Sequence, residues 1–390
     1  MADDVKNLLS LRVRGLEHRG WTSASVTRSI ETAASTFALE LTESWPGQQD
    51  SIGIRADDSC ELRMGDDLVI AGYMDILDID HDSTTLTIQA TGRSKTMDLV
   101  DCSCLTGKGQ QFIGLSLLQI ARQLAEPYGV EVVLSAESGD VWAPLSTAEF
   151  VPIARWAPEE GEHVVDAILK LASDQQLLVA DDTQGRLVLG RPGTKQGPAL
   201  SCPGNILKGH LRCDSSQRYS SYCVKGQRQG DDTNFGAVVA QAIAIIGDED
   251  IGRRRVLVIP AERQMTDASA KKRATWEAVY RAGRSATYEC TVQGWRDETG
   301  ALYEPGTICA VKDVICGVDA KLMLTAATWT LDASGLTTAL TFAPPGAYEP
   351  EPPIEQAKKK GGKAKASKIT TGIAPWGWFD QARLIVPRLP

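Results

Sequence analysis

Two segments of this chain, 254 residues apart, have the pattern of a long β-hairpin. Residues 68–89 (LVIAGYMDILDIDHDSTTLTIQ) and 322–343 (LMLTAATWTLDASGLTTALTFA) both alternate apolar and polar side chains on either side of a polar turn. Successive side chains of a strand point to opposite faces, so this alternation predicts two antiparallel strands joined by a short loop. An isolated hairpin is only marginally stable, so we expect each of the two hairpins to be part of a larger β-sheet.

The two hairpins also resemble each other in sequence. At a constant offset of 254, six of the 22 positions are identical, and they include the three leucine pairs of the predicted repeat: Leu68 with Leu322, Leu77 with Leu331, and Leu86 with Leu340. Chance is the alternative, because any two amphipathic hairpins share Leu and Thr. If the repeat is real, the chain carries two copies of one β unit, and three chains would present six similar units around one axis.

The chain changes character between the hairpins. The first hundred residues predict antiparallel strands, which we expect to close into a small barrel because open edges invite aggregation. The segments 115–129 and 160–176 instead repeat apolar residues at helical spacing, and the first ends at Pro127 and Gly129. A further helix is expected from residue 267, before the strand pattern returns. The predicted class is therefore α+β, mainly β.

Composition excludes several kinds of protein. The 390 residues include 43% hydrophobic and 23% charged residues, which indicates packed domains. The net charge of −9 argues against tight binding to a phosphate backbone. The first fifteen residues lack the basic and apolar regions of a signal peptide, and no apolar run reaches the ~18 residues of a membrane span. Nine scattered Cys then favour reduced thiols in a cytoplasm.

Signals of catalysis are missing from the sequence. HExxH, GxSxG and P-loop motifs are all absent. Cys102 and Cys104 form the one close cysteine pair, but no further zinc ligands follow at suitable spacing, so we expect ordinary thiols. No carboxylate pair is singled out for glycoside hydrolysis. We therefore predict no catalytic residue, metal or cofactor.

The acidic run around the first turn mimics the start of a calcium loop. Asp78, Asp80 and Asp82 have the spacing, but Ser83 replaces the required Gly and Gln89 the bidentate Glu. We therefore interpret this run as a solvated hairpin tip.

Tryptophans mark two other places in the chain. Trp21 and Trp295 each follow a Gly at a predicted strand edge, where a core position is favoured over a partner contact. Near the end, residues 358–368 contain six Lys among Gly, Ala and Ser, which predicts a flexible linker or an electrostatic tether. Beyond it, a docking peptide for a partner is predicted at Trp376, Trp378 and Phe379.

Several motifs resemble a known family. They are GWTSASVTRSIE (20–31), GRSKTMDLVDC (92–102) and QIARQLAEPYGVEV (119–132), followed in order by VKG (224–226), GW (294–295) and PG (305–306). Over residues 9–345 the chain resembles the baseplate hub proteins of contractile-tailed phages of the phage Mu type, which are related to the hub of phage T4. The segment after residue 346 has no match to this pattern.

The resemblance implies a homotrimeric, pseudo-sixfold ring that joins the hexameric tail tube to the trimeric central spike and lets DNA pass without specific binding. Baseplate wedge proteins and the tape measure protein are further expected partners. The location is the tail baseplate of the virion, after assembly in the host bacterial cytoplasm. Five parts are expected: a tube-like β-barrel (1–103), a mixed α/β domain (104–204), a second tube-like barrel (205–229 and 284–345), an insertion with a helix (230–283), and a linker with a docking tail (346–390).

Two other functions compete with the structural hub. One is a peptidoglycan hydrolase carried in the baseplate, for which no catalytic pair is evident. The other is a receptor- or carbohydrate-binding β-module, which the low aromatic content of 6% does not favour. We expect the hub, and no enzyme.

Overall fold

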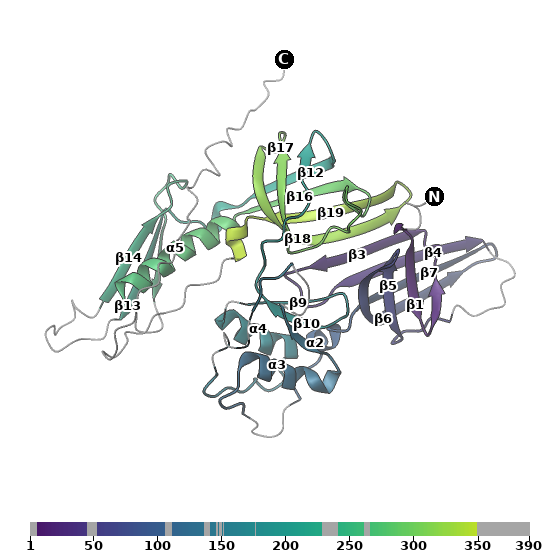
Figure 1. The fold of residues 1–390 in the computed structure, drawn as a ribbon, viewed down its shortest axis with the longest axis horizontal. Helices are drawn as coiled ribbons and strands as arrows, with labels where there is room; N and C mark the ends of the chain where they lie inside the picture. Colours follow the sequence, from purple (N-terminus) through teal and green to yellow (C-terminus); the bar gives the residue numbers. More distant parts are fainter. Residues whose placement is uncertain are drawn as a thin grey trace, which may run out of the picture. The chain divides into compact units, whose positions relative to one another are not determined.

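The computed structural model is mainly β, as the sequence predicts (Figure 1). It describes residues 6–44, 53–105, 111–135, 141–145, 147, 150, 152–175, 177–227, 241–260 and 266–348. The chain divides into two compact units. The first comprises residues up to Gly209, Glu289–Ala310 and Met323–Phe342; the second comprises His210–Tyr288, Val311–Leu322 and the chain from Ala343 on. No helix in the described ranges is long and apolar enough to cross a membrane.

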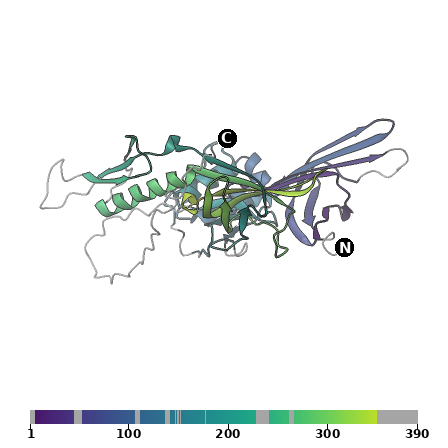
Figure 2. The same cartoon turned by 90° about the horizontal axis from the view of Figure 1, so that it is seen from above.

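The N-terminal β region contains seven strands. They are β1 (Leu9–Val13), β2 (Leu16–His18), β3 (Ser23–Ser29), β4 (Thr36–Ser44), β5 (Ser59–Met64), β6 (Asp67–His81) and β7 (Thr85–Ser94). Their order in the sheet is β3-β4-β7-β6-β5-β1-β2, with antiparallel pairing throughout. Figure 2 shows the β6–β7 hairpin, in blue, extending well past the shorter strands of this region.

The C-terminal β region contains six strands. They are β11 (Leu200–Cys202), β12 (Ile206–Cys213), β16 (Ala286–Gln293), β17 (Ile308–Asp313), β18 (Val318–Asp332) and β19 (Gly335–Ala343). Their order is β12-β16-β19-β18-β17-β11. Both long hairpins predicted from the sequence are therefore present, as β6–β7 and β18–β19.

The two β regions share one topology. If the strands of each region are numbered along the chain, with β2 left out, the N-terminal order is 2-3-6-5-4-1 and the C-terminal order is also 2-3-6-5-4-1. Strand β3 thus corresponds to β12, β6 to β18 and β7 to β19. Two independently evolved hairpins have no reason to share the order of four further strands, so the shared order favours duplication over chance resemblance.

Neither region closes on itself within the described strands. The sheet order has open ends at β12 and at β2, and β11 pairs with β17 alone. The two separate barrels expected from the sequence are thus open sheets in this chain, and β18 of the second continues into β3 of the first. An unpaired edge strand can be protected by pairing as well as by barrel closure. Here β18 of one copy pairs with β3 of the other, so this edge is protected although neither copy closes.

Helices and a small sheet lie between the two β regions in sequence. This part has α2 (Met97–Asp101), α3 (Leu117–Ala125), the 3-10 turn η1 (Glu126–Tyr128), α4 (Val164–Asp174), β8 (Val132–Leu134), β9 (Leu178–Asp181) and β10 (Leu187–Gly190). A capping box between Ser116 and Gln119 starts α3. The apolar faces of α3 and α4 share one core with the sheet β8-β10-β9, as their helical spacing predicts.

The second unit has a three-stranded sheet and the longest helix. Its elements are the 3-10 turn η4 (Ser215–Gln217), β13 (Ser221–Gln227), β14 (Gln241–Gly247), β15 (Val256–Pro260), α5 (Asp267–Arg284) and the 3-10 turn η5 (Pro345–Tyr348). Helix α5 packs on this sheet through Ala270 and Ala274 against Val224 and Ala244. Strand β13 pairs with β14 and β15, so the inserted part begins before β13, earlier than the sequence suggests.

Candidate assembly interface

The two β regions meet where β3 pairs with β18. Six residues of β18, Ala326–Leu331, pair antiparallel with residues 24–29 of β3 (Figure 1). One face of this junction is dry, because Val26 and Trp329 stand opposite each other and are 0% and 1% exposed. On the other face, the hydroxyls of Thr27 and Thr328 share a hydrogen bond of 3.0 Å. The junction is therefore built like the interior of one sheet.

Two tryptophans fix the end of this junction. The ring N–H of Trp295 donates to the Thr330 carbonyl at 3.0 Å, and the ring N–H of Trp329 donates to the Trp295 carbonyl at 3.3 Å. Trp295 follows Gly294, whose φ of +79° suits glycine at this tight turn. Both rings are 1% exposed, so Trp295 is a core residue, as the sequence predicts, and its ring nitrogen is satisfied.

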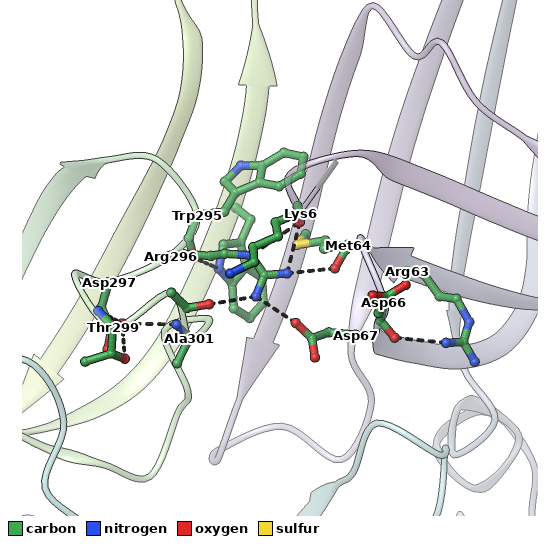
Figure 3. Close-up of polar contacts among 12 residues, drawn as sticks. Lys6, Arg63, Met64, Asp66, Asp67, Trp295, Arg296, Asp297, Thr299 and Ala301 are labelled. Atoms are coloured by element: carbon green, nitrogen blue, oxygen red, sulfur yellow. Dashed lines mark hydrogen bonds and ion pairs between the residues drawn. The ribbon is translucent and has the colours of Figure 1, made fainter. Parts of the chain in front are cut away.

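Arg296 is a second link between the two β regions, and its contacts are shown in Figure 3. Its guanidinium donates to the carboxylate of Asp67 at 2.7 Å and to the carbonyl of Met64 at 2.8 Å. It also donates to the carbonyls of Lys6, at 3.0 and 3.3 Å, and Gly300, at 3.0 Å. The side chain is only 12% exposed, so this network is largely screened from water.

The turn of each long hairpin begins with an aspartate. Asp82 Oδ1 accepts from the backbone N–H of Thr84 at 2.6 Å and of Thr85 at 2.8 Å. Asp332 Oδ1 accepts from the hydroxyl of Ser334 at 2.5 Å and from its N–H at 2.7 Å. These bonds lower the pKa of both carboxyls. Asp82 is therefore the counterpart of Asp332, at an offset of 250 residues.

This offset corrects the alignment made from sequence. At 254, Thr84 is matched with Thr338, but Thr84 lies in the turn whereas Thr338 is buried inside β19. The turn position is set by aspartate-to-backbone bonds and not by leucine spacing. The six leucines all lie in the hairpins but not at equivalent positions: Leu68 and Leu77 in β6, Leu86 in β7, Leu322 and Leu331 in β18, and Leu340 in β19.

The edge of β6 that corresponds to the filled edge of β18 has no partner in the described residues. Strand β5 pairs with β6 only as far as Tyr73, and Met74 still bonds to the backbone of residues 57 and 58. From residue 75 to the turn, no described strand pairs on this side. At the offset of 250, Ile79 corresponds to Trp329, yet Ile79 is 47% exposed.

One face of the joined sheet is rich in hydroxyl and acidic groups. Residues that are paired across strands share a face, so the register connects Thr330 of β18 with Ser25, Ala38 and Thr91 on successive strands. The next row contains Glu40, Gln89 and Asp78. Basic groups on this face are paired with carboxylates: Arg93 pairs with Asp75 and Asp101, each at 2.7 Å, and Arg63 pairs with Glu61 at 3.2 Å.

A buried carboxyl holds the link between β3 and β4. Asp181, at the end of β9, accepts from both the N–H and the hydroxyl of Ser35 at 2.9 Å. Burial raises the pKa of Asp181, while the charge of Arg28 acts in the opposite direction. These groups border a polar cavity of about 220 Å³ that is also lined by Asp182 and Arg186. Since Asp182 and Arg186 form an ion pair of 2.7 Å, we interpret the cavity as structural.

The remaining predicted site residues do not form a centre. Cys102 and Cys104 are free and partly buried, and burial raises the pKa of Cys104 to about 11. In the described part of the chain, no three His, Cys, Asp or Glu side chains gather as metal ligands. The predicted docking residues Trp376, Trp378 and Phe379 lie outside the described residues, as does the lysine-rich segment 358–368.

A basic edge strand, β12, was not predicted from the sequence. Strand β12 alternates Lys208, His210 and Arg212 with Leu207 and Leu211, and every residue from Leu207 to His210 is exposed. The signal was the short alternation LKGHLRC, which carries positive charge in an otherwise acidic chain.

Comparison with known families agrees with this architecture. Residues 8–94 match the N-terminal domain of the Mu phage baseplate assembly protein GpP-like family. Residues 96–191 match the second domain of the baseplate hub protein gp44-like family, and residues 266–351 match the fourth domain of the Mu phage baseplate assembly protein GpP. The matches therefore lie in both β regions and in the α/β part.

Individual relatives span nearly the whole chain. The baseplate hub protein gp44 of Escherichia phage Mu is 30% identical over 367 residues, which cover 92% of this chain and 93% of that protein. The 43 kDa tail protein of prophage MuSo2 from Shewanella oneidensis has a TM-score of 0.73 at 30% identity, over 88% of this chain and 100% of that one. A tail protein from Neisseria meningitidis MC58 has a TM-score of 0.69 at 22% identity, over 88% and 98%. This chain belongs to the Mu-type family of phage baseplate hub proteins.

Proposed function

We propose that three copies of this chain form a pseudo-sixfold ring, the structural hub of a contractile phage tail. The repeated strand order carries this proposal, because it gives each chain two β units of the same topology. Three chains then present six similar sheets to a hexameric tail tube. The rest of each chain keeps threefold symmetry, which matches a trimeric central spike. The tube-like barrel would close across chains, which accounts for the open sheets within one chain.

We further propose that the hydroxyl and acidic face lines the channel of the ring. Ser25, Thr328 and Thr330 offer no positive charge to a phosphate backbone, and the neighbouring Glu40 repels it. DNA would therefore pass without being held. An image of the assembled tail tip tests this directly, since a channel lined by Lys and Arg would contradict it.

The proposed partners follow from position in the baseplate. The tail tube protein and the central spike protein would contact opposite sides of the ring, with wedge proteins and the tape measure protein as further neighbours. The location is the virion, after assembly in the host bacterial cytoplasm. The division into two β units, an α/β domain, an insertion and a C-terminal docking tail with Trp376, Trp378 and Phe379 is part of the same proposal.

The role we propose is structural and not enzymatic. The titratable groups with shifted pKa are explained by burial, turns or ion pairs, as at Asp82, Arg93 and Asp181. The test against a peptidoglycan hydrolase is a cell-wall zymogram, in which the purified chain should leave the wall intact. Cleared wall material would instead support a baseplate-associated hydrolase.

Light scattering tests the oligomer. The expected result is a species of three times the 42.0 kDa mass of the chain, formed above a threshold concentration. A monomer at every concentration, including in the presence of the tail tube protein, would overturn the trimeric hub.

A further inference from the structure

One hairpin edge of this chain is filled by its own β3, while the matching edge of the other hairpin has no partner among the described strands. We propose that β12 of a second copy fills the open edge of β6, and that this pairing is the contact between subunits. The proposal rests on the trimeric ring proposed above and names the strands and residues that form its joints.

The internal junction supplies the template. Residues Ala326–Leu331 of β18 receive β3, and at the offset of 250 they correspond to residues 76–81 of β6. Strand β12 has the place in the C-terminal β region that β3 has in the N-terminal one, and its outer edge is unpaired among the described strands. The antiparallel pairing of β18 with β3 within a chain can therefore recur between chains, as an antiparallel pairing of β6 of one chain with β12 of the next.

Exposed apolar side chains lie on both open edges. Ile79 on β6 is 47% exposed and Leu207 on β12 is 58% exposed. At the filled edge, the counterpart of Ile79 is Trp329, which is 1% exposed and stands opposite Val26 of β3. A neighbouring strand would give Ile79 the same cover.

The charges of the two open edges are opposite. Asp78 and Asp80 share one face of β6, and Lys208, His210 and Arg212 share one face of β12. At the filled edge the corresponding β18 residues, Thr328 and Thr330, are uncharged. Charge pairing therefore distinguishes the joint between chains from the joint within a chain.

The same charges act against wrong pairings. Two β6 edges would bring Asp78 and Asp80 against their own copies, and two β12 edges would bring Lys208 and Arg212 together. The favoured contact is therefore heterologous, between β6 and β12. A heterologous contact forms a closed ring when its rotation closes and a filament when it does not. With two copies of the β unit per chain, closure after three chains gives the six-unit ring.

Register is set by the faces of the strands. A slip by one residue would place the apolar face of β12 against the charged face of β6. Two registers bring the charged face of β12 against the charged face of β6 with the greatest overlap. They place His210, the middle residue of the β12 face, opposite Asp78 or opposite Asp80. Opposed Cα atoms in an antiparallel pair lie about 4.5–5.5 Å apart, which is within disulfide reach.

Cysteine cross-linking tests the joint. In a background with Cys213→Ser, the pairs Asp78→Cys with His210→Cys and Asp80→Cys with His210→Cys are oxidised and separated on a denaturing gel. We expect covalent dimers and trimers with at least one pair, and no larger ladder because the ring closes. The control pair, Asp78→Cys with Lys312→Cys, should remain monomeric.

The outcomes separate this inference from the hub itself. A trimer by light scattering with no cross-link from either pair overturns the β6–β12 joint and leaves the hub intact. A monomer by scattering with no cross-link overturns both. An unlimited ladder of cross-linked products supports the joint but contradicts a closed ring.

Charge exchange gives an independent test without cysteines. Asp78→Lys with Asp80→Lys should raise the dissociation constant of the trimer at least tenfold, and adding Lys208→Glu with Arg212→Glu should recover most of it. The matched control, Glu160→Lys with Glu298→Lys, reverses two exposed carboxylates elsewhere and should leave assembly unchanged. Loss of assembly that the second pair of changes cannot recover would contradict the proposed pairing.

Discussion

The edges of β18 and β6 occupy the same position in two copies of one topology, yet one is core and the other is surface. Trp329 and Ile79 correspond at the offset of 250, and they are 1% and 47% exposed. The difference lies in the neighbouring strand: β3 pairs with this edge of β18, whereas beyond Tyr73 no described strand pairs with the corresponding edge of β6. Burial at such an edge therefore depends on whether a further strand pairs with it.

The largest expected effect comes from removing the buried side chain of Trp329 at the β18–β3 junction. Trp329→Ala should lower the free energy of unfolding by about 3–5 kcal/mol, because a buried ring and its hydrogen bond to Trp295 are lost. Ile79→Ala should change unfolding of the dissociated chain by under about 1 kcal/mol, and should weaken association about tenfold. Urea unfolding at low protein concentration and light scattering measure the two quantities. If Trp329→Ala and Ile79→Ala lowered the free energy of unfolding equally, the claim that one edge is core and the other is surface would be wrong.

The next effect concerns the Arg296 link. Arg296→Ala should cost about 2–3 kcal/mol of folding stability, because one largely buried guanidinium satisfies Asp67 and three backbone carbonyls. Arg63→Ala is the matched control, since Arg63 is 28% exposed and bonds to Glu61 and the Asp66 carbonyl. That change should cost under about 1 kcal/mol. Similar costs in the two variants would show that strand pairing alone joins the two β regions.

Two aspartates with opposite pKa shifts can be compared by pH: Asp181, which bonds Ser35 in the link after β3, and Asp332, which lies in the turn of the β18–β19 hairpin. Burial raises the folded-state pKa of Asp181, so its stabilising contribution is complete below the ordinary value of about 3.9 and is lost as pH rises through the folded value. Asp181→Asn should therefore gain stability relative to the natural chain as pH rises above about 4, the ordinary pKa of an aspartate. Each unit of pKa shift corresponds to about 1.4 kcal/mol. Denaturant unfolding across this range measures the difference.

The control for this titration is Asp332, whose pKa is shifted in the opposite direction to that of Asp181. The pKa of Asp332 is lowered by its bonds to Ser334, so its contribution is present at neutral pH and is lost as pH falls through the folded value. Asp332→Asn should thus approach the natural chain in stability at low pH. A pH trend of the same sign for both variants would contradict this assignment.

The smallest effect is a labelling rate. Cys213 is exposed on β12, whereas burial raises the pKa of Cys60 to about 12 and of Cys309 to about 11. An alkylating reagent at pH 8 should modify Cys213 first, and several-fold more slowly above the assembly concentration, because the joint would cover it. Cys60 should stay unmodified until the chain unfolds. Labelling of Cys213 that is independent of assembly would argue against β12 as an interface.

The sequence predicted the hairpins well because period-two alternation is a local signal. Residues 68–89 and 322–343 both form long antiparallel strands, and the helices α3, α4 and α5 lie where helical spacing and caps predict them. The family was also recognisable, since its motifs are short and contiguous. These features depend on neighbours in the chain.

The parts that failed depend on neighbours in space. Leucine spacing suggests an offset of 254, but the turns are aligned by Asp82 and Asp332, whose equivalence is established by their hydrogen bonds. The strand pattern of each copy predicts a closed barrel, because it cannot reveal that β18 pairs with β3 of the other copy. Arg296, which joins the copies, has no local sequence signature.

The insertion shows what covalent joining of the copies permits. The link after β3 consists of residues 30–35, while the corresponding link after β12, residues 214–285, holds a whole sheet and helix. In an assembly of six identical chains, any such addition would be inherited by all six positions. Here a single gene encodes two versions of the unit, so one can acquire a new lobe while the other keeps a short connection. In the proposed ring, such a lobe would decorate every second position without disturbing the fit of the rest.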